Sequence, residues 1–256
     1  MIVIGTAGYH YDDWVGPVYP KDIDKKDFLK YYSREFSMTE INFTYYRMPN
    51  KFIFYQMQKK TPDNFTFIVK AHQSMTHKID DDVPFNDFKE ALTPLVEADK
   101  FGGVLAQFPY RFKNNQKNRA YLSRLRDCMP DYPIFIEFRH NSWMKKPVFG
   151  FLSRLNLSYV SVDEPQISGL LPPIARATTD TAYIRFHGRN EDKWWEHDHA
   201  YERYNYEYSL EELGKWVKKI QKMEEELSKV YISMNNHYRG NAVFNARQLQ
   251  TMLKEE

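Results

Sequence analysis

The stretch Ile134-Phe-Ile-Glu-Phe-Arg139 carries the pattern that decides the fold: a short apolar strand that ends in charged residues two positions apart. Side chains at i and i+2 of a strand lie on one face, so Glu137 and Arg139 point the same way. Two other stretches end alike: residues 65–72 in Lys70 and His72, and residues 183–187 in Arg185 and His187. Such strands, repeated around a barrel, would gather titratable groups in one mouth, which is the layout of an active site on a (β/α)8 barrel.

Eight segments of this β type occur along the chain: residues 2–5, 38–42, 65–70, 103–107, 134–138, 158–162, 182–186 and 230–234. Segments with helical periodicity lie between them: 24–36, a helix capped by Asn50, 86–99, 116–128, 146–155, 210–228 and 242–254. Alternation of strand and helix favours parallel pairing, and eight units favour closure over an open sheet. A length of 256 residues is close to the ~250 typical of such barrels. We therefore predict an α/β fold, a (β/α)8 TIM barrel, with residues 1–256 as a single domain.

Composition narrows the class of protein. The formal net charge is only +2, which gives no electrostatic argument for a nucleic-acid partner or an anionic membrane. No apolar run approaches the ~18 residues of a membrane helix, so we expect no membrane partner. The N-terminal segment, residues 1–5, reads as a first strand rather than a signal peptide, and a cytoplasmic location follows as the default expectation. The single cysteine, Cys128, lies in a helical pattern and reads as a small buried hydrophobe.

Strand parity predicts which polar side chains face the mouth. We expect Glu137, Glu40 and His187 to supply acid–base chemistry. The other polar residues predicted to face or border the mouth, as ligand-binding groups, are Asn42, Lys70, His72, Gln107, Arg139, His140, Asp163, Arg185 and Asn235.

The charges in this predicted mouth indicate what it would hold. Three carboxylates, Glu40, Glu137 and Asp163, face three cations: Lys70, Arg139 and Arg185. A balanced set favours an anionic or polyhydroxylated ligand, held by the cations and acted on by a carboxylate or histidine. The alternative is a rim of arginine–carboxylate pairs that only holds loops in place.

A long polar and aromatic insertion, residues 188–208, follows the seventh strand. Loops of that length are usually functional or disordered, and its aromatic content argues against disorder. We predict a lid whose Trp194 and Trp195 stack on a sugar or a base; packing against the barrel rim is the alternative. Tyr9 and Trp14, after the first strand, are predicted to add a second aromatic wall.

No cofactor is predicted from the residues. The short run Gly5-Thr-Ala-Gly8 has neither the third glycine nor the lysine of a nucleotide-binding loop. We predict no metal ligand, because guanidinium groups beside a site oppose a cation. A divalent metal on Glu40, His72, Glu137, Asp163 and His187 stays open as an alternative.

The chain as a whole resembles the domain of unknown function 72 family, also called YecE-like. The matching motifs, in the family's order, are residues 5–9 with 14–20, 40–49, 67–71 with 76–77, 103–109, 137–143, 183–188 and 235–246. Tyr9 stands where the family usually has tryptophan. The resemblance implies a TIM barrel similar to xylose-isomerase-like and endonuclease IV-like barrels, which use metals on sugars and DNA, and it implies no particular activity.

Three functions follow as hypotheses. The first is an enzyme, a hydrolase or isomerase, on a sugar-like, phosphorylated or nucleotide-derived small molecule held in a metal-free pocket. The second is a metal-dependent phosphodiesterase or isomerase that acts on nucleic acid or a sugar. The third is a non-catalytic module that binds nucleic acid or a metabolite.

Overall fold

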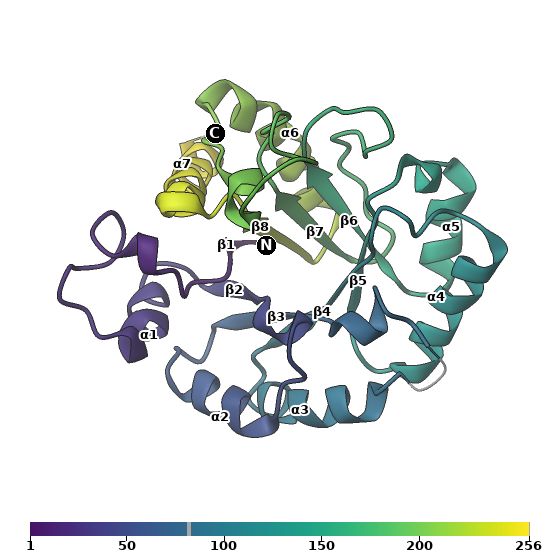
Figure 1. The fold of residues 1–256 in the computed structure, drawn as a ribbon, viewed down its shortest axis with the longest axis horizontal. Helices are drawn as coiled ribbons and strands as arrows, with labels where there is room; N and C mark the ends of the chain where they lie inside the picture. Colours follow the sequence, from purple (N-terminus) through teal and green to yellow (C-terminus); the bar gives the residue numbers. More distant parts are fainter. Residues whose placement is uncertain (81–82, 256) are drawn as a thin grey trace.

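Eight parallel strands close into a barrel in which neighbours in sequence are neighbours in space (Figure 1). The computed structural model describes residues 1–80 and 83–255. The strands are β1 (Ile2–Ala7), β2 (Met38–Ile41), β3 (Thr66–Lys70), β4 (Phe101–Gln107), β5 (Ile134–Glu137), β6 (Ser158–Asp163), β7 (Thr181–Phe186) and β8 (Lys229–Met234). β1 pairs with both β2 and β8, which closes the sheet. The predicted (β/α)8 barrel is confirmed.

The α-helices form an outer ring around the strands (Figure 1). They are α1 (Phe28–Tyr32), α2 (Lys51–Lys59), α3 (Phe85–Glu97), α4 (Gln116–Cys128), α5 (Lys146–Arg154), α6 (Leu210–Glu226) and α7 (Asn241–Glu255). The side chain of Asn50 accepts the amide of Ile53 and so caps α2 as predicted. Ser209 and Glu212 bond each other's backbone amides at the start of α6, which is the predicted capping box.

One helix is shorter than the sequence predicts, and one connection between strands lacks a helix. The predicted helix over 24–36 shrinks to α1, preceded by a 3-10 turn at Lys25–Asp27. Residues 164–180, all of them described, connect β6 to β7 without a helix. Prolines at 165, 172 and 173 explain this, because proline lacks the amide that a helix interior requires.

Side chains that point into the barrel form three layers of different chemistry. The lowest is aromatic: the ring of Tyr183 lies 5.1 Å from that of Phe135 and 6.4 Å from that of Tyr231. Two positions further along β5 and β7, Glu137 and Arg185 form an ion pair. The next inward positions lie just past the strand ends and are occupied by Arg139, His187 and Asn235. The barrel thus becomes more polar toward the carboxyl ends of its strands.

Candidate active site

The middle layer of the barrel is a network of ion pairs around Arg185. Its Nε and Nη2 atoms donate to the two carboxylate oxygens of Glu40 at 2.7 and 2.6 Å. Its Nη1 donates to Oε2 of Glu137 at 2.5 Å, and the hydroxyl of Tyr183 donates to Glu40. At most 2% of any of these side chains is exposed. Glu40 and Glu137, predicted as acid and base, therefore lie beneath the mouth with their charges already paired.

Glu137 connects this network to the layer above. Its Oε1 lies 2.7 Å from Arg139 Nη2 and 3.2 Å from His187 Nε2. Burial raises the pKa of Glu137, but Arg139 and Arg185 outweigh burial and hold that pKa well below its usual value. Burial, reinforced by Arg139, lowers the pKa of His187 well below its ordinary value. The Asn235 amide nitrogen lies 2.9 Å from His187 Nδ1, and Arg139 Nη2 lies 3.2 Å from its Nε2, which fits a neutral imidazole beside these donors.

Arg139 links the ion pairs to the open mouth. Its Nη1 donates to Oε2 of Glu164 at 2.9 Å, while the backbone amide of Leu171 donates to the other oxygen of that carboxylate at 3.1 Å. Burial raises the pKa of Glu164 to about 7, against the opposing effect of Arg139. The Arg139 side chain is 11% exposed, so part of the guanidinium faces the mouth.

Lys70 differs from the other charged residues of the mouth. It is the last residue of β3, and among the described residues no hydrogen bond or ion pair reaches its ammonium group. The ring of Tyr45 lies 4.9 Å from Nζ. Burial lowers the pKa of Lys70 to about 8, and the positive charges of Arg185 and Arg139 act in the same direction. The mouth therefore holds a partly desolvated amine that is not committed to a protein partner.

A cavity of about 310 Å³ opens above these layers. Its lining residues are Tyr45, Tyr46, Lys70, His77, Gln107, Pro109, Tyr110, Arg139, Leu170, Trp194, Trp195, Arg203 and Tyr204. Residues 194, 195, 203 and 204 belong to the insertion after β7, so this loop lies over the mouth as the lid prediction requires. The cations that line the cavity are Lys70, Arg139 and Arg203, whereas the carboxylates lie below it.

The two adjacent tryptophans of the loop have different surroundings. Trp194 is only 2% exposed, and its ring lies 5.7 Å from the guanidinium of Arg139 and 5.3 Å from that of Arg203. Trp195 is 49% exposed and meets the ring of Tyr110 edge to face at 5.2 Å. Trp194 thus packs against the two arginines, whereas about half of Trp195 stays exposed.

The inward-facing position predicted for Asp163 is wrong. Val162 pairs with Arg185 and shares its inward face, so Asp163 points out of the barrel. Its carboxylate accepts hydrogen bonds from Arg189 at 2.8 and 2.6 Å and from the indole of Trp216 at 2.7 Å. The inward carboxylate of this strand end is Glu164, which the sequence reading missed because two acidic residues stand side by side and either parity looks plausible.

The aromatic wall predicted after β1 is also wrong in detail. Trp14 is fully buried and donates its indole N–H to the carbonyl of His237 at 2.7 Å, so it has no face for a ligand. Tyr9 packs against Tyr32, with ring centroids 6.1 Å apart. Tyr11 stacks on His237, with ring centroids 4.4 Å apart.

Three further predicted ligand-binding residues lie at the margin. His72 Nδ1 lies 2.8 Å from the hydroxyl of Ser74, and His140 Nδ1 accepts the backbone amide of Ser142 at 3.0 Å, so each imidazole caps its own turn. Neither is among the residues that line the cavity. Asn42 follows β2 on the inward face, and its Oδ1 is buried without a hydrogen-bond partner.

Other cavity residues were not singled out from the sequence as ligand-binding groups: His77, Tyr110, Arg203 and Tyr204. They lie on loops, where strand parity gives no information. A usable signal exists for His77 alone, which belongs to the Thr76-His77 motif. Burial and the charge of Lys70 lower its pKa to about 4, so this imidazole is neutral beside the amine.

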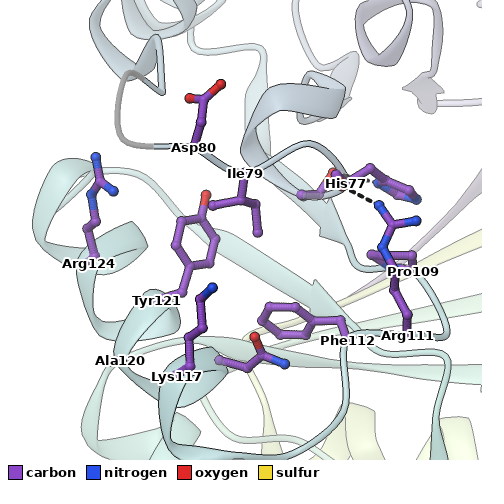
Figure 2. A pocket seen from close by; sticks show the side chains of 12 residues that line it. His77, Ile79, Asp80, Pro109, Arg111, Phe112, Lys117, Ala120, Tyr121 and Arg124 are labelled. Atoms are coloured by element: carbon purple, nitrogen blue, oxygen red, sulfur yellow. Dashed lines mark hydrogen bonds between the residues drawn. The ribbon is translucent and has the colours of Figure 1, made fainter.

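A second hollow of about 500 Å³ adjoins the mouth, and the two share His77 and Pro109 as lining residues. Figure 2 shows Lys117, Tyr121 and Arg124 of α4 on one side, with Ile79 and Asp80 from the loop after β3 opposite. Arg111 donates to the carbonyl of His77 at 2.5 Å and so forms part of the wall between the two spaces.

Neither a metal centre nor a membrane span emerges from the described residues. In ranges 1–80 and 83–255, no group of three or more His, Cys, Asp or Glu side chains is placed to hold a metal ion. The five residues weighed as metal ligands do not converge, because Asp163 points outward and His72 caps a turn. No helix within those ranges is long and apolar enough to cross a bilayer.

Comparison with known proteins decides the family. The model of the family described as "Protein of unknown function DUF72" matches residues 3–256. The chain belongs to the DUF72 family. The UPF0759 protein YunF of Bacillus subtilis (strain 168) is 33% identical, over 100% of this chain and 96% of that protein. The crystal structure of a DUF72 family protein from Thermotoga maritima is 40% identical, with a TM-score of 0.92 and coverage of 99% of both chains.

A second DUF72 crystal structure shows that the barrel persists at lower identity. The protein from Enterococcus faecalis is 28% identical, with a TM-score of 0.85 over 99% of this chain and 98% of that one. These relatives carry no stated activity, so function has to be argued from the site itself.

Proposed function

We propose that this DUF72 protein is an enzyme that acts on a small phosphorylated or otherwise anionic sugar-like molecule in the mouth of the barrel. One observation carries the proposal: the charged groups that line the cavity are the cations Lys70, Arg139 and Arg203, while Glu40 and Glu137 are buried and paired below. A cavity with cationic walls attracts an anionic group of the ligand.

The aromatic lining supports a ring-shaped ligand of limited size. Tyr45, Tyr204 and the exposed face of Trp195 surround the cationic floor. A volume of about 310 Å³ suits a sugar phosphate or a mononucleotide better than a polymer. Apolar walls with a few convergent polar groups are typical of small-molecule sites.

Lys70 supports catalysis in addition to binding. A general acid or base works best when its pKa lies near the operating pH, and the Lys70 pKa of about 8 meets that condition. We place Lys70 as the reacting group, Arg139 and Arg203 as the anion grip, and the paired Glu137 and Glu40 as supports that fix Arg139 and Arg185.

The test compares two ligands that differ only in a phosphate group. We expect ribose 5-phosphate to bind in isothermal titration calorimetry and ribose to bind at least tenfold more weakly. Lys70→Met should weaken binding of ribose 5-phosphate about tenfold, because a charge-assisted contact contributes roughly 1.5–3 kcal/mol. Lys218→Met, an exposed lysine on α6, is the matched control and should leave the affinity unchanged.

Turnover is read separately, by NMR of a panel of sugar phosphates incubated with the protein. Equal affinity for ribose and ribose 5-phosphate, or an equal loss in the Lys70 and Lys218 variants, would contradict anion binding in the mouth. Phosphate-dependent binding without change in any of the panel compounds would support a non-catalytic binding module instead.

A further inference from the structure

The environment of Lys70 is unusual for a residue that only binds an anion. Its ammonium has no hydrogen-bond or ion-pair partner among the described residues, although four charged groups influence it. Arg185 and Arg139 oppose its charge, while Glu40 and Glu137, which favour it, are engaged with those same arginines. The amine is therefore poorly stabilised as a cation, in a place where ligand can reach it.

The neighbours of Lys70 add no negative charge at close range. The Tyr45 ring covers it at 4.9 Å, and the neutral His77 lines the same cavity. Lysines that lie in apolar surroundings beside another cation lose their proton and become nucleophiles. With a pKa of about 8, roughly a quarter of the amine is neutral at pH 7.5, against about one in a thousand for an ordinary lysine.

We propose that Lys70 is a nucleophile that forms an imine with an aldehyde or ketone whose anionic group is held by Arg139 and Arg203. This proposal rests on the function proposed above and narrows its substrate to a carbonyl compound. The Lys70 nitrogen attacks the carbonyl carbon, and a C–N bond forms. The carbonyl oxygen then leaves as water with two protons, in net terms those of the amine, and a C=N bond remains.

The position of the cations fits this chemistry. Arg139 and Arg203 both line the cavity with Lys70, and their guanidinium groups lie 5.7 and 5.3 Å from the centroid of the Trp194 ring. They can hold a carboxylate or phosphate at one end of a small molecule while its carbonyl meets the amine. The ordinary acid–base pair of carboxylates is not needed, which agrees with the full burial of Glu40 and Glu137.

The experiment traps the imine by reduction. The full-length protein is incubated with glyoxylate and sodium cyanoborohydride, which delivers hydride to the imine carbon and leaves a stable secondary amine on lysine. Glycolaldehyde phosphate is the second probe, with phosphate in place of carboxylate. Peptide mass spectrometry then measures the rate of modification at each lysine. We expect Lys70 to react at least tenfold faster than the exposed Lys218, with half-maximal reactivity near pH 8.

Lys100 is an internal control in the same spectra. It is also buried, but its Nζ donates to the carbonyl oxygens of Gln58 and Thr61 at 2.7 and 2.8 Å. We expect no faster reaction at Lys100 than at Lys218, because its N–H groups are bonded to backbone carbonyls and its nitrogen is buried. A rate at Lys70 no higher than at Lys218 with both probes would overturn the nucleophile assignment.

Failure of this inference and failure of the proposed function give different results. Glycolate, which has the carboxylate of glyoxylate but no carbonyl, should slow the labelling of Lys70 by occupying the same site. Lys70→Arg should abolish trapping, whereas Lys218→Met should leave both trapping and ribose 5-phosphate binding unchanged. Ribose 5-phosphate binding in the wild type without labelling of Lys70 would leave anion binding intact and refute the imine. Absence of both would refute the two together.

Discussion

Two lysines at opposite ends of the barrel, Lys100 buried and Lys70 half-buried, have opposite surroundings. Lys100 directly precedes β4, is 4% exposed, and donates to two backbone carbonyls and to the hydroxyl of Thr61 at 2.7–3.3 Å. Lys70 is the last residue of β3, and no described residue offers its ammonium a hydrogen bond. The amino end of the barrel thus satisfies its buried cation, as stability requires. At the carboxyl end, where barrel enzymes have their active sites, the Lys70 ammonium has no hydrogen-bond partner among the described residues.

The largest expected effect on stability concerns Arg185, which pairs with two buried carboxylates, Glu40 and Glu137. Arg185→Met would leave Glu40 and Glu137 buried without their main partner. Removing one member of a buried ion pair typically costs about 3–5 kcal/mol, and we expect a loss of that size in urea unfolding. Arg247→Met breaks an ion pair with Glu35 near the surface and should cost less than about 1 kcal/mol. Similar losses in the two variants would contradict a buried network.

Lys100→Met should cause the next-largest loss of stability. The change leaves the carbonyls of Gln58 and Thr61 without their donor, and an unsatisfied buried group costs about 1–3 kcal/mol. Urea unfolding measures the loss, and binding of ribose 5-phosphate should be unaffected. An unchanged unfolding free energy would show that this lysine is solvated rather than bonded.

Lys70→Met, in contrast, should stabilise the protein at neutral pH. The folded-state pKa of about 8 lies below that of the unfolded chain, so the charged form is disfavoured by folding. Removing the charge should raise the unfolding free energy by about 1–3 kcal/mol at pH 7. The unfolded state binds more protons between pH 8 and about 10.4, so wild-type stability rises in that window and the advantage of the variant fades. A loss of stability at pH 7 would show that the Lys70 ammonium does have a stabilising partner in the folded protein.

The smallest effect on stability is expected for Trp195→Ala. This ring is 49% exposed and contacts Tyr110 edge to face, so the unfolding free energy should change by less than about 0.5–1 kcal/mol. The affinity for ribose 5-phosphate should fall several-fold, as loss of a stacking face costs about 1–3 kcal/mol. Unchanged affinity would place the ligand away from the lid.

The fold could be predicted from the sequence because each strand carries its own signal. Parity also placed Glu40, Glu137, Arg185 and Asn235 on the inward face, because polar residues stand two positions apart at the end of each of these strands. The capping box at Ser209 was readable for the same reason: local hydrogen bonds leave a local pattern.

The remaining features depend on partners far away in the chain. Asp163 points outward, where Trp216 and Arg189 donate hydrogen bonds to its carboxylate. These partners lie 26 or more residues away in the chain, so the sequence around residue 163 does not indicate them. Trp14 is buried because the carbonyl of His237 accepts its indole N–H. The sequence predicted that Lys70 lies in the mouth. It did not show that the charged groups around Lys70 are paired with one another, and this pairing makes Lys70 the reactive candidate.

The most direct test of this account is the titration of Lys70 in the intact protein. Trace acylation with acetic anhydride over pH 6–11, read by peptide mass spectrometry, gives the protonation curve of each lysine. We expect Lys70 to reach half of its full reactivity near pH 8. Phosphate in the buffer should shift this midpoint upward, because a bound anion stabilises the ammonium. A midpoint near the ordinary value of about 10.4, unaffected by phosphate, would contradict this expectation.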